Sequence, residues 1–315
     1  MSFVSKCFET KEERIANREK LMALPLEDKV TYSKMLIQRF YIQQRGKVYV
    51  SFSGGKDSTV LLDLVRSLYP DVPAVFFDTG LEFPEIREIA KSTENVLFIK
   101  PEMTFKKVIE TYGYPCIAKN VAHWISLAQR GFPSGIAQMN SDSKFGYRRY
   151  LYMVDAPFMV SERCCDVMKK RPAKEYHKQT GRCPYIGTRL DESRNRRESW
   201  ENEGENREGS IPSSNPLSIW TEKDIWDYIK SKKLPYSKAY DMGYERTGCV
   251  FCMFGIMKDR DRFIKLRATH PKLWAYCMKP TDQGGLGMKE VLDYMGIPTG
   301  CEQCNIFDFG GENIV

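Results

Sequence analysis

Hydrophobic residues in the first part of the chain form short runs that alternate with helical patterns. The runs at 48–52, 74–77 and 96–99 have the length and the β-branched or aromatic content of strands, and 74–77 is expected to be a buried one. Segments 60–68 and 84–90 follow the first two runs, and their apolar residues recur at helical spacing. This alternation predicts βαβ units, and therefore a mainly parallel sheet flanked by helices.

The segments outside these units predict the rest of the organisation. Charged residues with apolar ones at helical spacing predict one or two helices before the first strand, and 183–187 predicts a late strand. Two polar segments, 132–150 and 201–216, are expected to be an insertion and a mobile loop or lid. Thr221-x-x-Asp224 is a capping box that predicts a helix after it. The expected parts are a helical segment (1–45), an α/β domain (46–240) and a small Cys-rich module (241–315).

Composition narrows the class of protein. The 315 residues are 42% hydrophobic and 28% charged, which excludes a disordered, collagen-like or coiled-coil chain. No apolar run approaches the roughly 20 residues that cross a bilayer, and the N-terminus lacks the apolar region of a signal peptide. We therefore expect a cytoplasmic protein without a membrane segment. The net charge of +7 fits an anionic ligand such as a nucleotide and permits nucleic acid.

One motif between a predicted strand and a predicted helix predicts anion binding. It reads Ser53-Gly54-Gly55-Lys56-Asp57-Ser58. Its glycines allow close approach to an anion, the amides at the helix N-terminus point at the anion, and Lys56 adds positive charge. Ser58 is expected to cap the helix. The spacing is not that of a Walker loop, and the alternative is an ordinary strand-to-helix turn.

Two more segments lie at the carboxyl ends of predicted strands, where open parallel sheets bind ligands. Asp78-Thr79-Gly80 follows the second strand, and Gly187-Thr188-Arg189 follows the late strand. Arg189 and Arg194 can bind phosphate or sulfate through two hydrogen bonds. Arg196 is interpreted as part of a solvated helix face.

In a reducing compartment the ten cysteines favour metal, cluster or redox chemistry over disulfides. Six of them form pairs, namely Cys164-Cys165, Cys249-x-x-Cys252 and Cys301-x-x-Cys304. Thiolates at C-x-x-C spacing bind one metal centre from a tight turn. Zinc and buried thiols without a metal remain alternatives.

These motifs resemble a known family. Segment 53–58 resembles the pyrophosphate loop (PP-loop) of the adenine-nucleotide α-hydrolase superfamily. Three later segments resemble its phosphoadenosine phosphosulfate (PAPS) reductase branch. They are "DTG" at 78–80 followed by "FPE", the G-x-R-x-D-[EQ]-S-x-x-R segment that starts at Gly187 with Arg197 taken as its last arginine, and "NPL-x-x-W-T-E-x-D-[IV]-W" at 215–226. The resemblance covers about residues 46–255, and segment 246–255 also looks like uncharacterised bacterial and phage proteins of this type.

The resemblance implies a Rossmann-like fold, an adenine-nucleotide site and a cluster. ATP with Mg²⁺ would be bound by residues that the matching motifs supply: Ser53, Gly54, Gly55, Lys56, Asp57, Ser58, Asp78, Thr79, Gly80, Arg189, Arg194 and Arg197. Asp57 is the expected outer ligand of Mg²⁺. The Cys-Cys plus Cys-x-x-Cys pattern resembles the 4Fe–4S site of assimilatory adenosine phosphosulfate (APS) reductases, with ligands Cys164, Cys165, Cys249 and Cys252.

The chain departs from the reductases in two ways. APS and PAPS reductases lack the full loop because their substrates carry no β,γ-pyrophosphate, so the intact loop favours ATP. They also attack sulfur with a cysteine in a C-terminal E-C-G-[LI]-H segment, which this chain does not contain. Cys301 and Cys304 are the candidates to carry a persulfide or to attack. They are alternatively a second metal half-site with Cys277, or packing thiols.

The leading hypothesis is an ATP-binding PP-loop enzyme with a 4Fe–4S cluster. It would adenylate an acceptor, release pyrophosphate and act in sulfur transfer or sulfur metabolism, with Lys56, Arg189, Cys301 and Cys304 as its catalytic residues. One rival is a true APS or PAPS reductase with a thioredoxin-like reductant. Another is a non-catalytic nucleotide-binding component of a DNA-modification or defence complex. Expected partners are a sulfur donor such as a cysteine desulfurase, a nucleic-acid acceptor and further copies of the chain.

Overall fold

The computed structural model describes residues 10–142 and 146–300, which divide into two compact units. Within these limits, unit 1 holds 10–101 and 169–248, and unit 2 holds the intervening and following segments. The chain therefore passes from one unit to the other three times. The sequence predicted one domain boundary near residue 240. Each unit is instead built from two separate segments of the chain, and the order of elements along the sequence does not reveal such an arrangement.

A mainly parallel sheet forms the centre of unit 1, as the alternating pattern predicts. Among the described residues its strand order is β3-β2-β1-β5-β7-β6, and only the β6–β7 pair is antiparallel. The strands are β1 (Val48–Ser51), β2 (Ala74–Phe77), β3 (Val96–Ile99), β5 (Cys183–Ile186), β6 (Asn206–Arg207) and β7 (Ser213–Ser214). The chain thus has an α/β fold of the expected class.

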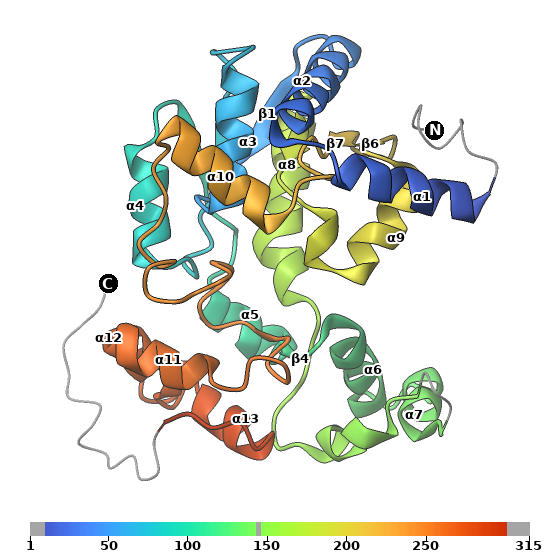
Figure 1. The fold of residues 1–315 in the computed structure, drawn as a ribbon. Coiled ribbons are helices and arrows are strands. Elements are labelled where there is room, and N and C mark those ends of the chain that lie inside the picture. Colours follow the sequence, from blue (N-terminus) through green and yellow to red (C-terminus); the bar gives the residue numbers. More distant parts are fainter. Residues whose placement is uncertain (1–9, 143–145, 301–315) are drawn as a thin grey trace. The chain divides into compact units, whose positions relative to one another are not determined.

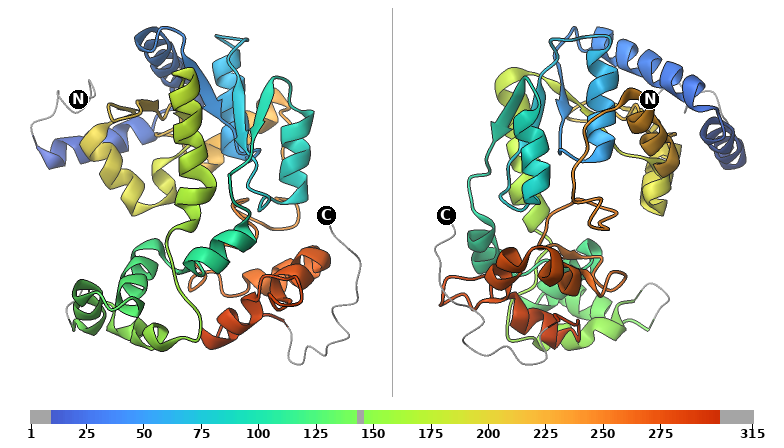
Figure 2. Two further views of the ribbon diagram at one scale, coloured as in Figure 1. Left: turned by 180° about the vertical axis from the view of Figure 1, so that it is seen from behind. Right: turned by 60° about the vertical axis from the view of Figure 1, so that its left-hand side comes forward.

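Helices cover both faces of this sheet (Figures 1 and 2). Val48 and Val50 of β1 are fully buried, and between them Tyr49 points to the other face, where it meets Tyr176 of α8 edge-on at 5.0 Å between ring centroids. The helices of unit 1 are α1 (Lys11–Met22), α2 (Leu26–Gln43), α3 (Lys56–Arg66), α4 (Pro84–Ser92), α8 (Arg171–Thr180), the short η3 (Leu190–Glu192), α9 (Arg194–Glu203) and α10 (Glu222–Lys232). The predicted capping box of α10 is present at Thr221 and Asp224.

The segment 201–216, expected to be a mobile loop or lid, instead completes the edge of the sheet. β6 and β7 pair there in antiparallel register, and the amide of Asn215 donates to the carbonyl of Glu205 at 2.9 Å. Ser214 is fully buried and Glu205 is 1% exposed. These strands were not predicted because they lack the apolar side chains by which strands are recognised in a sequence. Their evidence in the structure is the pairing of their backbones.

Unit 2 is mostly helical around a small parallel pair of strands, β4 (Cys116–Ile117) and β8 (Met253–Phe254). Its helices are α5 (Phe105–Tyr112), α6 (Lys119–Gln129), α7 (Pro133–Asn140), η1 (Arg148–Asp155), α11 (Arg262–Thr269), α12 (Pro271–Met278) and α13 (Met288–Tyr294), and η2 (Asp166–Lys170) spans the boundary to unit 1. The expected insertion at 132–150 therefore contains a regular helix, α7. In the described ranges, no helix combines the length and the apolar character needed to span a bilayer.

Candidate functional site

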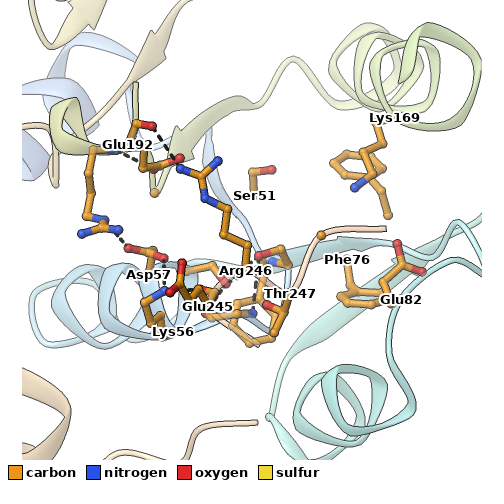
Figure 3. A pocket seen from close by; sticks show the side chains of 18 of the residues that line it. Ser51, Lys56, Asp57, Phe76, Glu82, Lys169, Glu192, Glu245, Arg246 and Thr247 are labelled. Carbon is orange, nitrogen blue, oxygen red and sulfur yellow. Dashed lines mark hydrogen bonds and ion pairs between the residues drawn. The ribbon is translucent and has the colours of Figure 1, made fainter. Parts of the chain in front are cut away.

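A cavity of about 890 Å³ opens in unit 1 beside the carboxyl ends of β1, β2 and β5. This is the edge at which parallel sheets bind ligands. Figure 3 shows Lys56, Asp57, Glu245 and Thr247 on one side of it, and Lys169, Phe76 and Glu82 on the other. Its charged lining residues are Lys56, Asp57, Glu82, Lys169, Lys170, Arg189, Asp191, Glu192, Arg196, Glu222, Glu245 and Arg246.

The predicted anion loop lies on the wall of this cavity, and its two glycines are closely surrounded, with Gly54 in a position that requires glycine. Gly54 has a left-handed backbone (φ +71°), and a Cβ there would lie 2.7 Å from the carbonyl oxygen of Ile86. A Cβ on Gly55 would lie 3.0 Å from Thr247 Oγ1. Glycine therefore permits both the turn and the close approach of segment 240–248.

The two serines of the loop fix its shape. Ser58 Oγ accepts from the amide of Ser53 at 3.2 Å and donates to the carbonyl of Gly55 at 2.8 Å. Gly55 is the N-cap of α3 and makes no side-chain capping bond, so the expected capping role of Ser58 is wrong. Its hydroxyl closes the loop from inside the first helical turn instead.

The ammonium group of Lys56 is buried and lies among acceptors. Only 3% of the residue is exposed, and Nζ lies 3.2 Å from Glu222 Oε1 and 3.7 Å from Asp57 Oδ2. It also donates to the carbonyl of Glu245 at 3.2 Å and lies 4.9 Å from the centre of the Tyr240 ring. These contacts hold the positive charge at the cavity wall.

The first amide of α3 donates to a side chain. The Lys56 N–H donates to the hydroxyl of Tyr240 at 3.0 Å, and this hydroxyl lies 3.0 Å from Thr247 Oγ1. Burial raises the pKa of Tyr240, so the hydroxyl stays neutral at physiological pH. The hydrogen bond of this N-terminal amide is thus made to a neutral oxygen, although a helix N-terminus favours an anion.

Arg189 is the second buried cation at the cavity, with 4% of the residue exposed. Its guanidinium meets three carboxylates: Asp57 at 2.6 Å, Glu222 at 2.7 Å and Asp191 at 2.9 Å. Burial opposes the charge, but Asp57 and Asp191 raise the pKa of Arg189 above its usual value. Burial likewise disfavours the charge of Glu222, and the contacts with Arg189 and Lys56 lower its pKa overall.

The predicted adenosine-binding segment lies beside the cavity without lining it. Asp78 is buried and pairs with Arg87 at 2.9 Å, and the Thr79 hydroxyl donates to Glu82 Oε1 at 2.6 Å. Gly80 has a left-handed backbone (φ +72°) and open space at its Cβ position. Of this turn, Glu82 is the residue that reaches the cavity wall.

The arginines after Arg189 are placed differently from the sequence assignment. Arg196 lines the cavity, whereas Arg194 is a largely exposed side chain paired with Glu198 at 2.7 Å, and Arg197 is not among the lining residues. Counted from Ser193, the S-x-x-R spacing ends at Arg196, so the assignment of the last arginine to Arg197 is one residue too far. Arg196 pairs with Glu192 at 3.2 Å.

Several cavity residues were not assigned to the site from the sequence. They are Glu222 at the start of α10, Tyr240, Glu245, Arg246 and Thr247 in the segment after it, and Lys169 and Lys170 before α8. Most of these residues are far from the loop along the chain, so the sequence did not indicate that they line the cavity. Glu222 stands in the recognised W-T-E segment and Lys169-Lys170 in a basic stretch, but neither feature alone indicates contact with the nucleotide loop.

The four cysteines expected to hold a cluster belong to unit 2, and none of them forms a disulfide. Each pair lies a few residues from a short β interaction in unit 2. Val160, four residues before Cys164, bridges to Tyr114, and Cys252 directly precedes β8, which pairs with β4. Four cysteine thiolates are a donor set that binds an iron–sulfur cluster. Within 10–142 and 146–300, however, no three His, Cys, Asp or Glu side chains are gathered to hold a metal ion. Cys301 and Cys304 lie outside the described residues.

Comparison with protein families gives a match over most of the chain. The family model described as the phosphoadenosine phosphosulfate reductase domain matches residues 47–126 and 89–254. These ranges include the loop, the cavity residues and both cysteine pairs of unit 2.

Curated relatives have low identity. Two uncharacterised proteins of Methanocaldococcus jannaschii, MJ0066 and MJ0973, are 28% and 26% identical over 76% and 82% of this chain. The alignments cover 42% and 54% of those proteins, so the chain spans about half their length. An adenosine 5'-phosphosulfate reductase of Staphylococcus epidermidis is 24% identical, over 76% of this chain and 83% of that one.

Solved structures resemble the chain only distantly. A PAPS reductase from Candida auris, in a phosphate complex, gives a TM-score of 0.43 at 17% identity over 77% of this chain and 96% of that one. The U34-tRNA thiolase NcsA from Methanococcus maripaludis, with its [4Fe-4S] cluster, gives 0.37 at 14% identity over 91% of this chain and 86% of that one.

Proposed function

The chain belongs to the phosphoadenosine phosphosulfate reductase domain family, and from this premise we propose that it binds ATP and adenylates an acceptor in sulfur metabolism. The observation that carries the proposal is the complete loop 53–58 on the cavity wall, with the two buried cations Lys56 and Arg189 beside it. A substrate that is already adenylated has no β,γ-pyrophosphate for this loop to hold. The loop therefore supports ATP as the substrate.

In the proposed reaction, a nucleophilic atom of the acceptor forms a bond to the α-phosphorus of ATP. The bond from that phosphorus to the bridging oxygen breaks, and pyrophosphate leaves with the electron pair. The loop amides and Lys56 would hold the β- and γ-phosphates, and Arg189 would stabilise the charge that develops in the transition state. Asp57 would bind Mg²⁺ through water, and sulfur would then displace the adenylate from the acceptor. A cysteine desulfurase as donor and a nucleic acid as acceptor remain proposals.

The cluster is part of the proposal. Cys164, Cys165, Cys249 and Cys252 would hold a 4Fe–4S cluster, after their side chains gather around it. Such a cluster has four thiolate ligands and no open iron, so it would supply structural stability and local charge. Sulfur would come from a partner or from Cys301 and Cys304, whose persulfide role stays a prediction.

A true APS reductase is the second candidate, favoured by the similarity to the staphylococcal enzyme. It requires a thiol that attacks sulfur and a thioredoxin-like reductant. The absence of an E-C-G-[LI]-H segment from the sequence and the presence of the complete loop both favour ATP. Assembly into a homo-oligomer stays an expectation.

Nucleotide binding tests the proposal. Calorimetry should show tighter binding of ATP with Mg²⁺ than of APS or PAPS. Lys56→Ala should weaken ATP binding by about 1.5–3 kcal/mol, the range for a hydrogen bond to a charged group. Lys223→Ala removes the same charge from an exposed position on α10 and should change little. Tight binding of PAPS with no binding of ATP would refute the proposal, and pyrophosphate release on addition of candidate acceptors would identify the turnover.

A further inference from the structure

Glu222 occupies an unusual position between the two cations of the loop region. Its Oε1 lies 3.2 Å from Lys56 Nζ, and its Oε2 lies 2.7 Å from a terminal nitrogen of Arg189. One carboxylate thus spans both positive charges with one oxygen each. A phosphate or pyrophosphate group presents oxygens of the same charge and hydrogen-bonding type.

Exposure separates Glu222 from the other partners of these cations. Its side chain is 51% exposed, whereas those of Asp57 and Asp191 are 22% and 25% exposed. Asp191 is further held because it accepts from the backbone amide of Glu222 at 2.8 Å, and the other acceptor of Lys56 is a backbone carbonyl, that of Glu245. Glu222 is therefore the partner that can rotate into solvent without disturbing the fold.

Charge gives the reason for it to move. Lys56 and Arg189 supply two positive charges, and Asp57, Asp191 and Glu222 supply three negative ones. A phosphate chain added to this group would face a surplus of negative charge. Rotation of Glu222 away from the cations removes that surplus and frees a hydrogen-bonding position on each of them.

We propose that the Glu222 carboxylate is a resident anion that holds the phosphate position of the empty site, and that the pyrophosphate moiety of the nucleotide displaces it. This inference rests on the proposed function, because it assumes that Lys56 and Arg189 receive the β- and γ-phosphates. It makes Glu222 a specificity-determining residue. Lys56 and Arg189 are taken to receive the β- and γ-phosphates, so ATP and pyrophosphate displace the carboxylate, whereas AMP, whose one phosphate is the α-phosphate, does not compete with it.

The test measures binding of inorganic pyrophosphate by calorimetry, with EDTA present so that no divalent cation is involved. Glu222→Gln keeps the size of the side chain and removes its charge. It should bind pyrophosphate roughly threefold to tenfold more tightly than the wild type, because a competing charged contact is lost. Glu222→Ala should show the same direction, and neither variant should alter the affinity for AMP.

Asp227→Asn is the matched control. Asp227 is on the same helix, and its carboxylate pairs with the exposed Lys223 at 2.5 Å, away from the residues that line the cavity. Its affinity for pyrophosphate should stay within about twofold of the wild type, since an exposed charge has a weak effect. Thermal melting of each variant checks that the fold is kept.

The remaining outcomes separate the two proposals. If the wild type binds pyrophosphate and Glu222→Gln binds it equally or more weakly, Glu222 orients Arg189 rather than competing with the ligand, and the inference is wrong while the proposed function stands. If neither the wild type nor the variants bind pyrophosphate or ATP, both fail.

Discussion

Burial and neighbouring charges shift the pKa of the Asp57 carboxyl group in opposite directions. Burial raises its pKa above the ordinary value of 3.8, and the charges of Arg189 and Lys56 lower it, with a net upward shift. The nearby carboxylates of Glu192 and Glu222 add to the upward shift. In the folded protein the charged form of Asp57 is therefore less favourable than it is in water.

This balance predicts a pH dependence. Because the folded pKa of Asp57 is raised, its contribution to stability is present below 3.8 and is lost as the pH rises through the folded value. The free energy of unfolding of the wild type, minus that of Asp57→Asn, should therefore fall with rising pH and then level off. Urea denaturation at a series of pH values measures this difference, and Asp227→Asn serves as the exposed reference. A difference that rises with pH would mean that the ion pair with Arg189 outweighs burial.

Helix α10 positions Glu222 at the wall of the cavity. Thr221 caps it, with the Thr221 amide donating to Asp224 Oδ2 at 2.7 Å. Asp224 also accepts from Lys29 of α2, a residue only 2% exposed, at 2.6 Å. These bonds fix the first turn of α10, and Glu222 is its first residue.

Loss of Asp224 should therefore destabilise the protein strongly. Asp224→Ala leaves the buried ammonium of Lys29 without this carboxylate, which typically costs about 3–5 kcal/mol. Thr221→Ala removes only a cap and should cost about 1 kcal/mol. Chemical denaturation compares the two, with Asp227→Ala as the exposed control. Adding Lys29→Met to Asp224→Ala should recover most of the loss, and equal effects of Asp224→Ala and Asp227→Ala would contradict the argument.

The sequence predicts those helices and strands that depend on side chains close together in the chain. The strands at 74–77 and 96–99 and the capping box of α10 are confirmed because apolar runs and local hydrogen bonds determine them. The β6–β7 pair was missed because its strands are two residues long and polar. Contacts such as that of Tyr240 with the Lys56 amide join residues 184 positions apart, so no local pattern indicates them.

At the scale of the whole molecule, the division into units shows the same limit of sequence analysis. Residues 102–168 were expected to belong to the α/β domain, and they lie in unit 2 with 249–300. The sequence analysis grouped Cys164-Cys165 with Cys249-x-x-Cys252, and both pairs belong to unit 2. A motif can be recognised in this way without knowledge of the domain boundaries. Cys164 and Cys165 lie just before the chain enters unit 1 at residue 169, and Cys249 follows directly after the chain leaves unit 1 at residue 248.

The metal content tests the assignment of these cysteines. Protein purified without oxygen should be brown and contain about four irons per chain, as a four-cysteine cluster requires. Cys165→Ser and Cys249→Ser should each lose iron and colour and lower the melting temperature of the holoprotein. Cys116→Ser is the control, since this fully buried thiol has its pKa raised by burial and is unsuited to act as a thiolate ligand. Stoichiometric zinc without acid-labile sulfide would refute the cluster.

The pairing of β4 with β8 has a consequence for biosynthesis. A ribosome makes the described strands of the unit 1 sheet, including β5 and β7, before it makes β8. About 90 residues separate Cys165 from Cys252, so at about 5–20 residues per second the second pair of thiols emerges on the order of ten seconds after the first. During that interval Cys164 and Cys165 have been synthesised and Cys249 and Cys252 have not. In the proposed cluster, the order of translation therefore leaves the first two ligands without the other two for that interval.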